Sequence, residues 1–169
     1  IISFLSFFNI IYSYYFNLYL NIDAYIVTLF SSLIIGVILL FKKKIDKKIT
    51  IYEKIIIVIT GYILLPIIIS IPYYLSIYNI SLMDCYFEAI SGFTSTGFTI
   101  IENIEHLDES LILWRSTSQW IGGIYFLFSI VILIDIFDNS LKKSLTNFIS
   151  FNTSEVFKQS FKILILYII

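Results

Sequence analysis

The chain has 169 residues, of which 59% are hydrophobic, 18% are aromatic and only 14% are charged, with a net charge of -1. A soluble domain usually has about 45–50% apolar and about 25% charged residues, so this chain carries too little charge to cover a water-exposed surface. The composition excludes a soluble enzyme, a nucleic-acid-binding protein and a disordered tail, and it leaves an integral membrane protein or a piece of one.

Long apolar stretches follow one another along the chain, at residues 1–20, 24–41, 55–80 and 111–137. Each has about 18–27 residues, which is enough for a helix to cross the hydrocarbon core of a bilayer. A membrane strand would need only about 10 residues and would alternate apolar with polar positions, which these stretches do not do. The sequence therefore predicts an all-α integral membrane fold.

The lysines predict the orientation of these spans. Six lysines lie between residues 42 and 54, and Lys142, Lys143 and Lys158 follow the last long stretch. Cytoplasmic loops carry an excess of Lys and Arg, so both segments are expected in the cytoplasm. The predicted organisation is a leading helix pair at 1–41, a basic cytoplasmic loop at 42–54, a repeat at 55–137, a cytoplasmic segment at 138–160 and the start of another span at 161–169.

Two prolines interrupt the third apolar stretch, at Pro66 and Pro72. Each would cost about 3 kcal/mol inside a soluble helix, but membrane helices tolerate proline. We expect a kink that shapes packing, with a functional hinge as the alternative. The single cysteine, Cys85, is expected to be a small buried side chain.

The segment from 81 to 110 is too long and too patterned for a simple turn. An amphipathic run at 83–90, too short to cross a bilayer, leads into SGFTSTGFT at 91–99, where hydroxyls and two glycines gather. Irregular backbone is tolerated at membrane depth only when it is buried in protein or lines a watery cavity. This pattern is typical of a re-entrant pore loop, and an ordinary external loop with a Ser/Thr/Gly turn is the alternative.

Such a loop suits an alkali cation. Hard oxygen ligands bind these ions, and a filter presents unpaired carbonyl oxygens to a dehydrated cation. Gly97 permits the positive φ that this requires, and the preceding short helix would point its negative C-terminal end at the ion. Further hydroxyl oxygens are available on Thr94, Ser95, Thr96 and Thr99. Acids that would concentrate cations at the outer mouth follow at Glu102, Glu105, Asp108 and Glu109.

Two motifs carry a family resemblance. The run DCYFEAISGFTSTGFT at 84–99, followed by WRSTSQWIGG at 114–123, resembles the Trk/Ktr/HKT superfamily of potassium transporters, and most of all its TrkH-type potassium uptake proteins. The resemblance implies helix–pore-loop–helix repeats arranged pseudo-fourfold around one pore. The chain begins at Ile1 and ends within an apolar run, so we expect an N-terminal fragment with two leading helices and the first repeat.

The resemblance also implies site residues. The filter strand would be Ser95, Thr96, Gly97 and Phe98, flanked by Thr94 and Thr99, with K⁺ as the transported ion and no organic cofactor. Phe98 is bulkier than the small residue usual in the family, and it is expected to pack behind the filter as an aromatic cuff. Tyr125 stands where the family often has a glycine, and this larger side chain argues against close helix packing at that position.

Arg115 near the outer end of the fourth stretch has two interpretations. An arginine deep in lipid is costly, so it either anchors at the interface with the aromatic residues around it or pairs with Glu88 of the pore helix. Gly122 and Gly123 are expected to permit close helix approach.

The function expected from this resemblance is membrane transport of potassium, inward through a filter of pore loops, with this chain supplying the first filter strand. Expected partners are the lipid bilayer, a second copy of the full-length protein and a cytoplasmic nucleotide-binding regulatory subunit, in a multi-pass protein of the bacterial inner membrane. A membrane enzyme is disfavoured because the sequence has no HExxH motif, P-loop or paired intramembrane carboxylates. A non-conducting membrane anchor or assembly subunit is the alternative.

Overall fold

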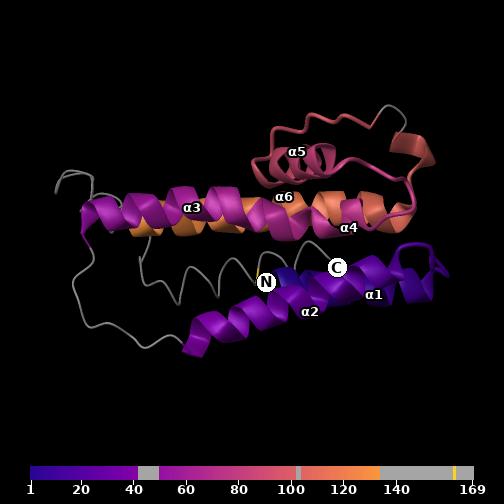
Figure 1. The fold of residues 1–169 in the computed structure, drawn as a ribbon, viewed down its shortest axis with the longest axis horizontal. Helices are drawn as coiled ribbons and strands as arrows, with labels where there is room; N and C mark the ends of the chain where they lie inside the picture. The colour runs from indigo at the N-terminus through magenta and orange to yellow at the C-terminus, as the bar shows by residue number, and fades with distance from the viewer. Residues whose placement is uncertain (42–49, 102–103, 134–161, 163–169) are drawn as a thin grey trace. The chain divides into compact units, whose positions relative to one another are not determined.

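The computed structural model of the chain describes residues 1–41, 50–101, 104–133 and 162 (Figure 1). Every element in these ranges is helical, which confirms the predicted fold class. The helices are α1 (Ile2–Tyr15), α2 (Ile22–Phe41), α3 (Ile51–Ile69), α4 (Ile71–Tyr74), α5 (Leu82–Phe93), the 3₁₀ turn η1 (Ile104–His106) and α6 (Glu109–Leu133). Most of the predicted basic loop and the predicted segments at 138–160 and 161–169 lie outside the described residues, apart from residue 162.

Two compact units divide the chain. One comprises Ile1–Lys47 and Gly61–Gly123, and the other comprises Lys48–Thr60 and Ile124–Ile169. The first unit contains the whole segment from α4 to the first half of α6. In this unit α2 contacts both α1 and α4, and α4 contacts α5.

Three helical segments are long and apolar enough to cross a membrane: Ile22–Phe41, Ile51–Tyr74 and Glu109–Leu133. They correspond to the second, third and fourth predicted spans. α1 has 14 residues, which is about 21 Å, whereas the hydrocarbon core is about 30 Å thick. It ends at Tyr15, where the chain turns through Asn17 in the left-handed region (φ 58°) and returns along α2. That α1 belongs to a span of its own stays a prediction.

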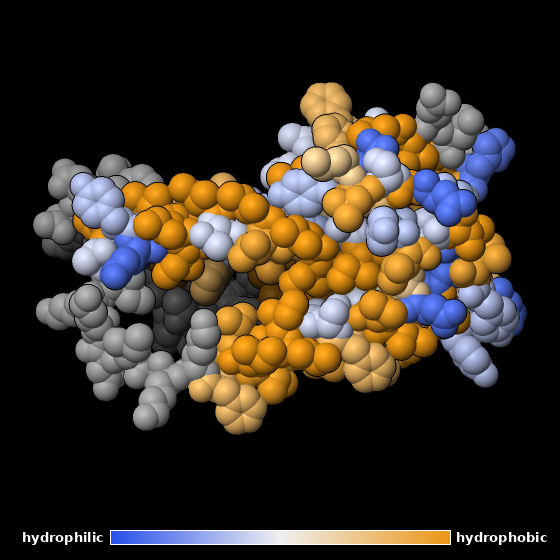
Figure 2. Space-filling view, in the orientation of Figure 1, coloured by the Kyte–Doolittle hydropathy of each residue, from blue (hydrophilic) through white to orange (hydrophobic). Residues whose placement is uncertain are grey.

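Apolar side chains cover the visible faces of α2 and α3 (Figure 2). Leu40 is 85% exposed and Phe41 84% exposed at the end of α2, and Ile34 and Ile38 are also exposed. Apolar surface on this scale belongs in a lipid or protein environment rather than in water. The chain is therefore part of a multi-pass membrane protein.

The two prolines lie in different helices. Pro66 is buried inside α3, whereas Pro72 occupies the first turn of α4, where a missing N–H costs least. Ser70 separates the two helices and keeps the backbone nearly continuous, because its N–H donates to Pro66 O at 2.8 Å and its carbonyl accepts from Tyr74 N at 3.0 Å. The third span is thus a long helix with a short second helix at its C-terminal end.

α5 is a short amphipathic helix of 12 residues, about 18 Å long, which is too short to cross a bilayer. Ser81 caps its N-terminus: the Ser81 hydroxyl accepts from Asp84 N at 3.3 Å and donates to Asp84 Oδ2 at 2.7 Å. Its buried residues include Cys85, Glu88, Ala89, Gly92 and Phe93, at the i, i+3, i+4, i+7 spacing of one helix face.

Close packing of α5 on α6 depends on two glycines. A Cβ atom added at Gly122 would lie 1.7 Å from the carbonyl oxygen of Phe93, and one at Gly92 would lie 2.1 Å from Ser118 Oγ. At Gly123 no described atom would lie within 4 Å. Gly122 therefore makes the close helix approach expected from the sequence, Gly123 makes none within the described part of the chain, and Gly92 was not anticipated.

Replacing Gly122 with Ala should destabilise the full-length protein by about 1–3 kcal/mol, because the new methyl group meets backbone that has to shift. Gly123→Ala is the matched control and should leave stability unchanged. The measurement is the thermal unfolding midpoint of the purified protein in detergent. Equal midpoints for the two variants would contradict this packing.

Candidate functional site

The segment after α5 is an exposed, non-helical strand. All six residues from Thr94 to Thr99 are exposed. Two of them have left-handed backbone, Ser95 with φ 56° and Gly97 with φ 79°. Such a conformation is uncommon for a serine, so the surrounding contacts have to hold it.

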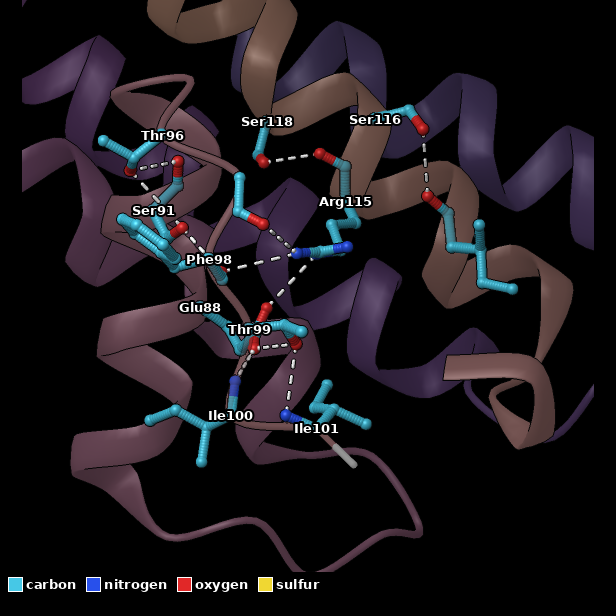
Figure 3. A network of polar contacts seen from close by, with 12 residues as sticks. Glu88, Ser91, Thr96, Phe98, Thr99, Ile100, Ile101, Arg115, Ser116 and Ser118 are labelled. Atoms are coloured by element: carbon cyan, nitrogen blue, oxygen red, sulfur yellow. Dashed lines mark hydrogen bonds and ion pairs between the residues drawn. The ribbon is translucent and has the colours of Figure 1, made fainter. Parts of the chain in front are cut away.

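Hydroxyl groups fasten the first part of this strand to the C-terminal turn of α5 (Figure 3). Thr94 Oγ1 donates to Ile90 O at 2.7 Å, and Thr96 Oγ1 donates to Ser91 O at 3.1 Å. In the other direction, the buried Ser91 hydroxyl donates to Phe98 O at 2.6 Å. Through this hydrogen bond Ser91 connects the end of α5 to the far part of the strand, a role that the sequence did not predict.

Glu88 fastens the second part of the strand. Its side chain is fully buried, and its Oε1 accepts hydrogen bonds from Ile100 N at 2.7 Å and from Thr99 Oγ1. Its Oε2 accepts from Arg115 Nε at 3.2 Å. A buried carboxylate is tolerated only when its oxygens have such partners. One side chain of α5 thus joins the strand to α6.

Arg115 completes the connection between α6 and the strand. Beside its ion pair with Glu88, its Nη2 donates to the carbonyl oxygens of Gly97 at 3.3 Å and Phe98 at 3.4 Å. Figure 3 shows the guanidinium between α6 and the strand. The contact with Glu88 is the second of the two interpretations from the sequence.

Trp114, the aromatic residue next to Arg115, lies in the protein interior and not at a membrane–water interface. Trp114 is fully buried, donates from Nε1 to Ile69 O at 3.0 Å and packs its ring 5.9 Å from that of Tyr25. It anchors α6 to α2 and to the end of α3. The interfacial anchor expected as an alternative is therefore wrong for Trp114.

The hydrogen bonds decide which oxygen atoms remain available. The hydroxyls of Thr94, Thr96 and Thr99 donate to groups of α5, so they brace the strand. The carbonyl oxygens of Thr94, Ser95 and Thr96 accept no hydrogen bond within the described ranges. Neutral, hard carbonyl oxygens on an exposed strand suit a dehydrated alkali cation.

Phe98 is 70% exposed among the described residues, and its packing as a cuff behind the strand stays a prediction. One expectation about a neighbouring residue, Asp108, is wrong. Asp108 is only 9% exposed and is hydrogen bonded, whereas Glu109 is exposed. Asp108 therefore does not belong to a solvated acidic mouth. Glu102 and the side chain of Glu105 lie outside the description.

The fold and the strand together define a helical multi-pass membrane protein in which a short helix turns back through an extended, polar segment. Residues 22–169 match the TrkH family of cation transport proteins. The chain belongs to this family.

Individual relatives are similar over shorter stretches. The chain is 49% identical over 55 residues to an uncharacterized cation transporter of Methanocaldococcus jannaschii, covering 32% of this chain and 12% of the relative. It is 39% identical over 66 residues to the Trk system potassium uptake protein TrkI of Halomonas elongata, covering 39% and 12%. It is 30% identical over 102 residues to the Trk system potassium uptake protein TrkH of Salmonella typhimurium, covering 59% and 21%. The matches thus span at most 21% of each of these relatives, and no solved structure is significantly similar to the chain.

Replacing Arg115 with Leu should destabilise the full-length protein by about 3–5 kcal/mol, because the buried Glu88 carboxylate loses its counter-ion. The double variant Glu88→Leu/Arg115→Leu should be less destabilised than Arg115→Leu alone, since it leaves no unpaired charge. Thermal unfolding of the unaltered protein, Glu88→Leu, Arg115→Leu and the double variant measures this coupling. Additive losses would contradict the pairing.

Cys85 should react slowly with thiol reagents. Burial raises the pKa of its thiol to about 11, and Asp84 adds to the rise, so the thiolate is a small fraction at pH 8. Met83→Cys on the same helix is the control, because Met83 is 76% exposed. Alkylation of each position is followed by mass spectrometry. Comparable rates at pH 8 would show that Cys85 is accessible.

Proposed function

We propose that the full-length protein carries K⁺ into the cell through a filter, and that this chain contributes the first of its strands. The strand consists of Ser95, Thr96, Gly97 and Phe98, with Thr94 and Thr99 at its ends. The observation that supports this most is the braced, exposed backbone from Thr94 to Thr96, whose carbonyl oxygens accept no hydrogen bond from the described residues. Relatives named as potassium uptake proteins support the choice of ion.

Conduction follows from exchange of ligands. Carbonyl dipoles replace the water that a K⁺ ion loses on entering, and the binding has to be weak enough at each position for the ion to leave. A single strand surrounds an ion on one side only, so further strands from the remainder of the protein complete the site. No chemical bond is made or broken, which makes the protein a transporter and not an enzyme.

The residues that hydrogen bond to the strand keep its backbone rigid. Glu88, Ser91 and Arg115 hold the strand from one side through hydrogen bonds to its hydroxyl, N–H and carbonyl groups. The carbonyl spacing then stays nearly constant when the ion moves. Since Arg115 donates to the carbonyls of Gly97 and Phe98, the oxygens nearest the ion are those of Thr94, Ser95 and Thr96.

The setting of the full protein follows the family resemblance. The protein lies in the bacterial inner membrane as a homodimer, and it binds a nucleotide-binding regulatory subunit at its cytoplasmic face. The lysines at 42–54 are on that face by the positive-inside rule. The alternative is a non-conducting anchor or assembly subunit, which the exposed, bulky Phe98 in the strand favours.

Growth of an uptake-deficient bacterium at limiting K⁺ tests the proposal. The full-length gene should restore growth, and Gly97→Ser should weaken this rescue, because a side chain at φ 79° costs about 1–2 kcal/mol of backbone strain in the filter. Gly36→Ser in α2 is the matched control, since no described atom lies within 4 Å of a Cβ added there. Failure of the unaltered gene would contradict transport, and full rescue by Gly97→Ser would contradict the filter assignment.

A further inference from the structure

A buried polar cluster surrounds the start of α6, about two turns before Arg115. Its centre is the Asp108 carboxylate, whose Oδ2 accepts from Asn21 Nδ2 at 3.0 Å and from Ser110 Oγ at 2.7 Å. Asn21 is only 2% exposed and Ser110 is fully buried. Asn21 belongs to the turn between α1 and α2, so one carboxylate oxygen joins the leading helix pair to α6.

Other hydrogen bonds extend this cluster to α1, to α2 and to the segment before α5. The Tyr25 hydroxyl of α2 lies 3.0 Å from Ser110 Oγ, and Asn9 Nδ2 of α1 donates to Ser110 O at 3.3 Å. The N–H of Asp108 donates to the Tyr78 hydroxyl at 2.7 Å. The start of α6 is thus fixed from α1, from α2 and from the segment between α4 and α5.

The position of α6 decides where Arg115 reaches. Arg115 follows Asp108 by seven residues, which is two helical turns or about 10.5 Å on the same side of the helix. Trp114 is held between Tyr25 and Ile69 O. Because an α-helix is stiff over two turns, a displacement at Asp108 moves the Arg115 guanidinium and with it the Gly97 and Phe98 carbonyls.

We propose that Asp108 is a positioning residue of the ion pathway, which acts with Asn21 by fixing the outer end of α6. It does not act as a charge that attracts cations, because its carboxylate is buried and occupied by two donors. This inference rests on the proposed function. In this arrangement the leading helix pair is part of the scaffold that shapes the filter.

The test is K⁺ uptake by the full-length protein, with the K⁺ concentration for half-maximal uptake and the preference for K⁺ over Na⁺ as readouts. Asp108→Ala should change both by about fivefold, as expected for a residue coupled to a site through packed elements. Asp108→Asn should remain close to the unaltered protein, since an amide oxygen still accepts both hydrogen bonds. Glu109→Gln, at the exposed acid next in the chain, should also be neutral.

Charge attraction gives the opposite pattern. Asp108→Asn would then be as impaired as Asp108→Ala, Glu109→Gln would share the defect, and raised ionic strength would remove the difference. That pattern would overturn the inference. Unchanged uptake and selectivity in Asp108→Ala would overturn it as well. Absence of uptake by the unaltered protein would instead contradict the proposed function, and this inference with it.

A second pair of variants guards against simple misfolding. Asn21→Ala and Asp108→Ala should produce the same selectivity defect, and the double variant should be no worse than either one, because the two side chains form one contact. The exchange Asn21→Asp/Asp108→Asn keeps a carboxylate facing an amide, so its selectivity should be close to that of the unaltered protein. The amount of protein in the membrane is measured for each variant. An exchange as defective as Asp108→Ala at equal protein levels would overturn the pairing.

Discussion

The site depends on the hydrogen bonds and the ion pair that the buried Glu88 carboxylate makes. This carboxylate joins three segments, since it lies on α5, accepts hydrogen bonds from Thr99 of the strand and from Ile100 directly after it, and pairs with Arg115 of α6. A carboxylate in this position is stable only while all of these donors are present. The requirement works in both directions, because the carboxylate also keeps the donors in place and gives the exposed strand a single shape.

Close helix contact makes this ion pair possible. Gly92 and Gly122 remove the side chains that would separate α5 from α6, so that a short carboxylate meets an arginine across the interface. Similar small-residue contacts drive helix association in membranes, where water provides no hydrophobic force between helices. The cluster at Asp108 then fixes the same helix at its N-terminal end. Two polar anchors about two turns apart thus define the position of α6.

The length and hydropathy of single segments predicted the membrane-spanning helices correctly, because the lipid bilayer acts as their solvent. Three of the predicted spans correspond to helices that are long and apolar enough to cross a membrane, because the bilayer imposes length and hydropathy on each segment separately. The short helix before the glycine-rich segment was also predictable, from its amphipathic run and its length. The first span was not recovered in full, since α1 ends where Asn17 turns the chain, and that turn has no signature in hydropathy.

The sequence by itself determined that this is a helical membrane protein, and where a strand rich in hydroxyls and glycine interrupts the helices, because those properties belong to single segments. Only the tertiary structure decided what each polar side chain does. The threonines hydrogen bond to α5 and brace the strand, and Phe98 is exposed. Asp108, expected among the acids of an outer mouth, is instead buried against Asn21, which is 87 residues away along the chain. The physical reason is that a hydrogen bond depends on distance in space, and composition and periodicity contain no information about which distant segments meet.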